Sequence, residues 1–134
     1  MAKESGALTV IIDDSGGSAR TISTTAILSV DMSTPRGVQD VTSVAQSAMD
    51  RLLLLADYSA TFTGAFNDGA NDAHVVFKTV PSSSVARTTS VAHSGQTLAV
   101  EAFFTDYSVS RGQDGSLTTS APCVLTGGSV PTWA

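Results

Sequence analysis

The side chains that could act as nucleophiles, bases or metal ligands are few and scattered in this sequence. The chain has two histidines, His74 and His93, and a single cysteine, Cys123. Both histidines lie among turn-forming residues, and no base stands near the cysteine, so a packed, unreactive thiol is the simpler interpretation. We therefore predict no catalytic residues, no metal site and no cofactor, and we expect that the protein is not an enzyme.

Three further stretches resemble ligand sites only superficially. Residues 13–18, DDSGGS, have the glycines of a phosphate loop, but no Lys follows them. Residues 67–72, NDGAND, have the composition of a calcium loop without its spacing or closing Glu. Glu101 interrupts the apolar run LAVEAFF, where it marks the polar face of a half-buried strand more simply than an acid with a raised pKa. We predict surface turns and a strand at these positions.

Composition limits the class of protein further. The chain has 134 residues, of which 42% are hydrophobic and only 14% charged, and its formal net charge is −5. Its length fits one domain, residues 1–134, with enough hydrophobic residues for a core. The acidic balance disfavours a nucleic-acid binder. The chain has no stretch of about 18 apolar residues, so we expect no membrane segment and folding in a cytoplasm.

Alternating polarity and turn residues predict a mainly β fold. Two strands flank the Gly-rich turn 14–19, and a second hairpin turns near residues 93–95. A further turn at 112–115 leads into a last strand interrupted by Pro122, which indicates an edge or a bulge. We expect a β-sandwich or barrel of about six to seven antiparallel strands with one helix packed on it. The predicted strands are residues 7–13, 20–30, 57–67, 84–95, 96–112 and 116–126. Within 57–67, one face holds Ala60, Phe62, Gly64 and Phe66 and the other Ser59, Thr61 and Thr63; within 96–112, one face holds Leu98, Val100, Ala102 and Phe104 and the other Ala99, Glu101, Phe103 and Thr105.

One helix and one long loop complete the prediction. Residues 43–56, SVAQSAMDRLLLLA, place Val44, Ala48, Leu52 and Leu55 at helical spacing, with Asp40 or Thr42 as the cap. Residues 31–39 contain Pro and Gly and form a rather long loop before it. The apolar run 75–80 fits a strand or a short helix, and periodicity leaves this open.

Several motifs, in this order, resemble the major tail tube proteins of long-tailed bacteriophages. They are DVTS at 40–43, TGAFND at 63–68, AH at 73–74 and the block EAFFTDYSVSRGQDGSLTTSAPCVLTGGSVPTW at 101–133. The resemblance covers residues 7 to 133 and is greatest to the compact proteins of actinobacterial phages with non-contractile, siphovirus-type tails. It implies a single β-sandwich-like tail-tube domain with one flanking helix.

The resemblance also implies a structural function in the virion tail. Six copies would form a ring, and rings would stack into a hollow tube through which the genome passes. The parts expected to contact the next ring are the N-terminal arm 1–6, the loop 31–39 and the C-terminal arm 127–134. The resulting inter-ring candidates are Asp31, Met32, Ser33, Thr34, Pro35, Arg36, Pro131 and Trp133. Glu101, Asp40 and Asp106 are the candidates for an acidic lumen, whose charge would repel DNA phosphates and leave only non-specific contacts.

The expected partners are other copies of the chain, the tape measure protein, the tail terminator and the distal tail protein, with assembly in the host bacterial cytoplasm. Two other roles stay open. One is a tail terminator, head–tail connector or capsid decoration protein, and the other is a stand-alone β-sandwich binding module. A terminator would stay as single rings or monomers, whereas a binding module would carry an exposed aromatic cluster.

Overall fold

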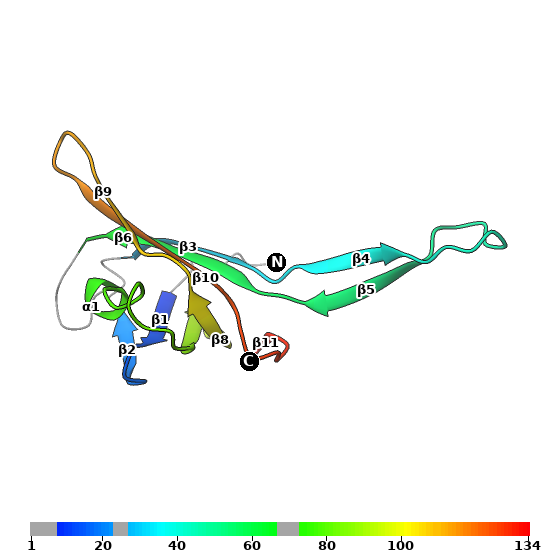
Figure 1. Ribbon diagram of the computed structural model, residues 1–134, viewed down its shortest axis with the longest axis horizontal. Coiled ribbons are helices and arrows are strands. Elements are labelled where there is room, and N and C mark those ends of the chain that lie inside the picture. The colour runs from blue at the N-terminus through cyan, green and yellow to red at the C-terminus, as the bar shows by residue number, and fades with distance from the viewer. Residues whose placement is uncertain (1–7, 23–26, 67–72) are drawn as a thin grey trace.

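A computed structural model describes residues 8–22, 27–66 and 73–134, and Figure 1 shows their arrangement. The described part of the chain is mainly β, with antiparallel strands and one short helix, which confirms the predicted fold class. The strands are β1 (Leu8–Asp13), β2 (Ala19–Ile22), β3 (Ile27–Ser33), β4 (Arg36–Asp40), β5 (Arg51–Ala56), β6 (Ser59–Ala65), β7 (Arg87–His93), β8 (Gln96–Phe104), β9 (Ser108–Arg111), β10 (Leu117–Leu125) and β11 (Thr132–Trp133); the helix is α1 (Ala73–Phe77). The predicted N-terminal arm, residues 1–6, lies outside the described residues.

Nine of the strands form one antiparallel sheet, in which seven follow the order β2-β1-β7-β8-β10-β6-β3, while β9 pairs with β10 and β11 with β8 beside this path. β9 pairs with the first half of β10, and β8 pairs with its end, so the switch between these two neighbours falls at Ala121 and Pro122. This explains how a proline is tolerated within a central strand, since neither β9 nor β8 pairs with it on that side. β11 pairs with β8 next to the end of β10.

The hydrophobic core lies on one face of this sheet, which α1 covers (Figure 1). Side chains alternate along each strand: in β8, Leu98, Val100 and Ala102 are buried, whereas Ala99, Glu101 and Phe103 are exposed. β6 alternates in the same way. Both alternations were predicted from the sequence, and the structure confirms them.

Arg87 joins the helix to the sheet from inside the core. Its side chain is 2% exposed, and its guanidinium donates hydrogen bonds to the carbonyls of Asp13 (3.1 Å) and Val76 (2.8 Å) and to Thr79 Oγ1 (3.0 Å). Burial lowers the pKa of Arg87, although Asp14 and Asp13 oppose this. The cation therefore stabilises the fold by supplying donors to a helix end and a strand end that would otherwise lack them.

The segment predicted as a helix, residues 43–56, is instead half of a β-hairpin. β4 and β5 pair as a separate two-stranded sheet, which we call the arm (residues 36–56), and it extends away from the nine-stranded sheet in Figure 1. β3 continues into β4 and β5 into β6, so the arm prolongs the β3–β6 ribbon, with Asp57 N–H bonded to the Pro35 carbonyl between them. The predicted loop 31–39 is therefore mostly strand.

The same chemistry that suggested a helix cap closes the tip of the arm. The Asp40 carboxylate accepts hydrogen bonds from Thr42 N–H (2.9 Å) and Thr42 Oγ1 (2.6 Å), and Ser43 N–H donates to Gln46 Oε1 (2.6 Å). The two bonds from Thr42, the hydroxyl first and the backbone N–H second, lower the pKa of Asp40. Short polar side chains bond to backbone N–H groups in turns as readily as at helix starts, so this signal did not distinguish the two.

The other predicted elements match with local changes. The hairpins around residues 14–18, 94–95 and 112–115 are present, the second with Ser94 and Gly95 at positive φ (50° and 87°). The predicted strand 20–30 is divided: β2 and β3 lie at opposite ends of the sheet. The undecided run 75–80 belongs in part to α1.

Candidate assembly surface

The arm carries an unusual amount of exposed hydrophobic surface. Among the described residues, fifteen large hydrophobic side chains are exposed, and eight of them lie in the arm. These eight are Val38, Val41, Val44, Met49, Leu52, Leu53, Leu54 and Leu55. A two-stranded hairpin is only marginally stable in water, and apolar patches of this kind mark interaction sites.

Both faces of the arm are apolar. Neighbouring residues of a regularly paired strand point to opposite faces, so Leu52 and Leu53, which pair with Gln39 and Val38, lie on opposite sides of β5. Leu52 is 53% exposed, and Leu53 is 52% exposed. A ribbon in contact with its own domain would need only one apolar face. Two such faces make the arm a candidate contact surface on both sides.

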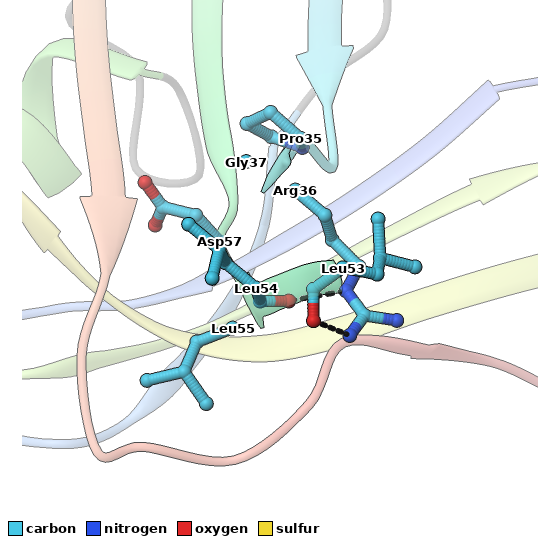
Figure 2. Close-up of a pocket in the computed structure, with 7 residues that line it drawn as sticks. All are labelled: Pro35, Arg36, Gly37, Leu53, Leu54, Leu55 and Asp57. Carbon is cyan, nitrogen blue, oxygen red and sulfur yellow. Dashed lines mark hydrogen bonds between the residues drawn. The ribbon is translucent and has the colours of Figure 1, made fainter. Parts of the chain in front are cut away.

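The root of the arm is braced by Arg36 and Gly37. A bulge between Arg36 and Val38 interrupts the β4–β5 ladder. Arg36 Nε donates to the Leu54 carbonyl (2.7 Å) and Arg36 Nη2 to the Leu53 carbonyl (3.5 Å), as Figure 2 shows. A Cβ at Gly37 would stand 3.2 Å from Leu54 Cδ1, so the leucine packs closely on this glycine. Arg36 thus has a structural contact that the sequence interpretation did not include.

The sheet face opposite α1 forms a second distinctive surface, which we call the outer face. Its strands present mostly Ser and Thr, for example Ser59, Thr61 and Thr63 of β6. Its acidic side chains are Asp13, Asp31 and Glu101, and the described strands place no Lys or Arg on it. The described strands of the nine-stranded sheet contain three arginines, Arg20, Arg87 and Arg111. Their cross-strand partners are Ile12, Ala102 and Leu117, which lie on the core-facing side, so the arginines lie on that side too.

The predicted inter-ring residues fall into two groups. Asp31, Met32 and Ser33 lie in β3, Thr34 and Pro35 connect it to β4, and Arg36 begins β4, so six candidates lie together where the arm meets the sheet. Met32 is partly buried against the core, whereas Asp31 points to the outer face opposite Thr61.

The C-terminal candidates lie elsewhere. Residues 127–131 form a loop that begins with Gly127 and Gly128, both at positive φ (81° and 71°). After this loop, β11 pairs with β8. Trp133 pairs with Leu98, and its ring centroid lies 6.4 Å from that of His93, which leaves it 49% exposed. The C-terminal arm is therefore attached to its own sheet, with half of Trp133 still uncovered.

The three lumen candidates do not share a surface. Glu101 lies on the outer face, where it accepts a hydrogen bond from Thr88 Oγ1. Asp40 lies on the arm, and Asp106 precedes β9 and accepts from Tyr107 N–H (2.8 Å). The sequence analysis did not identify Asp13 as a residue of the outer face, and it predicted Asp31 as an inter-ring contact instead. Strict alternation along β1 and β3 would have placed both on the side opposite the core.

Among the residues that the structure describes, the remaining titratable groups form no reactive cluster. Burial raises the pKa of the Cys123 thiol to about 12, in keeping with a packed cysteine. His74 Nδ1 lies 3.1 Å from Tyr107 Oη within an aromatic cluster, far in the fold from the pair formed by His93 and Trp133. Within the described ranges, no three His, Cys, Asp or Glu side chains could together hold a metal ion. No helix among those same residues is long and apolar enough to span a membrane.

Comparison with solved structures identifies the fold. The chain is similar to a chain from the tail of an empty gene transfer agent (GTA) particle, computed with helical refinement and C6 symmetry, with a TM-score of 0.74, 16% identity, and 95% of this chain and 93% of that chain covered. It is also similar to a chain from the virion of a native GTA particle (TM-score 0.71, 17% identity, 92% and 95% covered).

A third similar chain comes from the six-fold symmetrised baseplate of the anti-feeding prophage (TM-score 0.65, 9% identity, 100% and 96% covered). No protein-family model matches the chain, and no curated protein matches it. The chain therefore has the fold of structural chains from phage-like tail particles, over nearly the whole length of each.

Proposed function

We propose that this protein is the subunit of a phage-type tail tube, in which six copies form a ring and rings stack into a hollow tube. It would assemble in the host bacterial cytoplasm and remain in the virion tail, with the tape measure, terminator and distal tail proteins as partners. The resemblance in the sequence favours a non-contractile, siphovirus-type tail of an actinobacterial phage. The function is structural rather than enzymatic.

The observation that carries the proposal is the arm. A free subunit would leave apolar side chains on both faces of a two-stranded ribbon in water, at a cost of about 25 cal/mol for each Å² that an assembly could bury. A subunit that is surrounded by copies of itself covers these faces. The likeness to chains of symmetric tail particles supports this interpretation, because it extends over the arm as well as the sheet.

Ring formation is supported by the ends of the sheet. β2 and β3 are its terminal strands, and each has a strand neighbour on one side only among the described residues. Unpaired strand edges must be covered or used. Joining the edge strands of adjacent copies around a six-fold axis would convert six open sheets into one closed wall.

The outer face has the properties that a lumen would require. Asp13, Asp31 and Glu101 carry its charge, and it offers no cation to DNA phosphates within the described strands. Contacts between cations and phosphates dominate non-specific DNA affinity, so their absence lets a genome pass without adhering. We assign this face to the lumen, with Glu101 retained as a lumen residue and Asp40 and Asp106 placed elsewhere.

Negative-stain electron microscopy of the concentrated pure protein tests the proposal. We expect hollow tubes or six-fold rings, with analytical ultracentrifugation reporting species of six subunits or more. A protein that stays monomeric at high concentration would contradict the proposal.

The likeness to a baseplate chain favours a second candidate, a ring at one end of a tube, such as a terminator or a distal component. The same experiment distinguishes the two. Single rings that never lengthen, even when seeded with short tubes, would support the end component, whereas continued growth would support the tube subunit.

A further inference from the structure

The tip of the arm is a compact, internally bonded projection, which we call the knob (residues 41–50). Thr42 Oγ1 accepts from Asp50 N–H (2.7 Å), the Asp50 carbonyl accepts from Val41 N–H (2.9 Å), and Gln46 Nε2 donates to Asp50 Oδ2 (3.0 Å). Val41, Val44 and Met49 nevertheless point into solvent, and Val44 is fully exposed. The knob thus presents apolar side chains in a conformation that its own hydrogen bonds already hold.

An apolar groove lies at the opposite end of the same arm. This root groove is lined by Thr34, Arg36, Leu55, Ala56, Val130 and Pro131. Its two most exposed apolar side chains are Leu55 (91%) and Val130 (71%). The loop that forms one wall is held in place at both ends, by Thr126 N–H on the Glu101 carbonyl (3.0 Å) and by β11 on β8.

The knob cannot fill the root groove of its own chain. The paired strands β4 and β5 separate the two, and Figure 1 shows the knob at the far end of the extended arm. The knob and groove of one chain are therefore available only to other copies.

The charges of the two surfaces are complementary. Arg36 is the single charged residue that lines the root groove, and its bonds to backbone carbonyls fix the guanidinium there without neutralising it. The knob is flanked by the carboxylates of Asp40 and Asp50 and by Arg51, which pairs with Asp40, so two carboxylates stand beside one cation and the net charge there is negative. Opposite charges at the rim of an apolar contact favour one partner and one orientation.

We propose that the knob of one subunit inserts into the root groove of a second copy, with Val44 against Leu55 and Val130 and with Asp40 or Asp50 facing Arg36. This inference rests on the proposed function and names the acceptor surface within it. The contact joins two different surfaces, so it can repeat from copy to copy around a ring or along a helical array, as the proposed function requires.

Crosslinking between singly substituted chains tests the contact. Val44→Cys and Val130→Cys place one accessible thiol each on the knob and the groove, while the native Cys123 is 1% exposed. The two variants, one with a mass tag, are mixed, concentrated and treated with a short thiol-to-thiol crosslinker. We expect a tagged–untagged heterodimer that forms only when both cysteines are present. Val109→Cys, 47% exposed on β9, is the control partner and should not replace Val130→Cys.

A second variant measures the contribution of the contact. Val44→Asp should raise the concentration needed for half-assembly by about tenfold, because it removes one buried valine from each contact. Because Val44 is exposed in the subunit, the unfolding midpoint of the Val44→Asp variant should equal that of the parent protein within experimental error.

The possible failures are distinguishable. If microscopy shows tubes or rings while Val44→Cys crosslinks to itself or to Val109→Cys, or not at all, the root groove is not the acceptor, although the proposed function stands. If the parent protein forms no assembly in microscopy or ultracentrifugation, the proposed function is overturned together with this contact.

Discussion

The leucines of β5 allow folding and assembly to be separated in a single variant. Leu53 and Leu55 both lie in β5 of the arm and are 52% and 91% exposed in the subunit. Replacing both with serine removes little packing from the isolated chain. We therefore expect its free energy of unfolding to change by about 0.5 kcal/mol or less, as for other surface substitutions.

The expected effect on assembly is much larger. Burying a leucine fully is worth about 1.5–3 kcal/mol, and the exposed fractions leave most of that value for Leu55 and about half for Leu53. The double variant should lose at least about 2 kcal/mol per arm, which corresponds to about thirtyfold in the concentration needed for half-assembly. Sedimentation velocity over a concentration series, with urea unfolding of the dispersed subunit, measures both quantities.

A matched pair provides the control for this experiment. Val85 and Val109 are also exposed (39% and 47%) but lie outside the arm, and their replacement by serine should leave assembly within a few-fold of the parent. Assembly of the Leu53→Ser/Leu55→Ser variant at the parental concentration would refute the interpretation of the arm as an interface. A fall of about 2 kcal/mol or more in the variant's unfolding free energy would instead show that the leucines stabilise their own subunit.

Four further substitutions test other parts of the structure. Arg87→Met should lower the unfolding free energy by about 2–5 kcal/mol in urea, because the Asp13 and Val76 carbonyls lose their buried donor; a loss under about 1 kcal/mol would contradict the bracing role. Tyr58→Phe should be neutral or stabilising by about 1 kcal/mol, because the Tyr58 hydroxyl is buried with no partner among the described residues; a clear destabilisation would show that the hydroxyl is bonded. Glu101→Lys should leave unfolding unchanged but increase retention of double-stranded DNA by assembled tubes at low salt, and equal retention would place Glu101 outside the lumen. Trp133→Ala should weaken assembly more than folding in paired sedimentation and urea experiments, and the reverse order would assign Trp133 to its own sheet alone.

The largest difference between sequence and structure concerns residues 43–56. Four consecutive leucines satisfy a helical stripe and both faces of a strand equally well, and Asp40 and Thr42 bond in a turn as they would at a helix start. The outcome was decided by pairing with β4 and by continuity with β6, contacts that no local pattern contains. The proposed function accounts for an apolar run that is exposed on both sides, because neighbouring chains would cover it. Hydrophobic periodicity within one chain carries no information about such contacts between chains.

The sequence alone determined the mainly β class, the three hairpin turns and the two faces of β6 and β8. These features depend on residues close together in the chain, through strand alternation and the backbone preferences of turns. The tertiary structure alone decided the arm, the buried position of Arg87, the return of Trp133 to β8, and the placement of Asp13, Asp31 and Glu101 on a face where the described strands carry no cation. Each of these depends on which distant strands pair, and pairing is governed by the total burial of the sheet rather than by any local pattern.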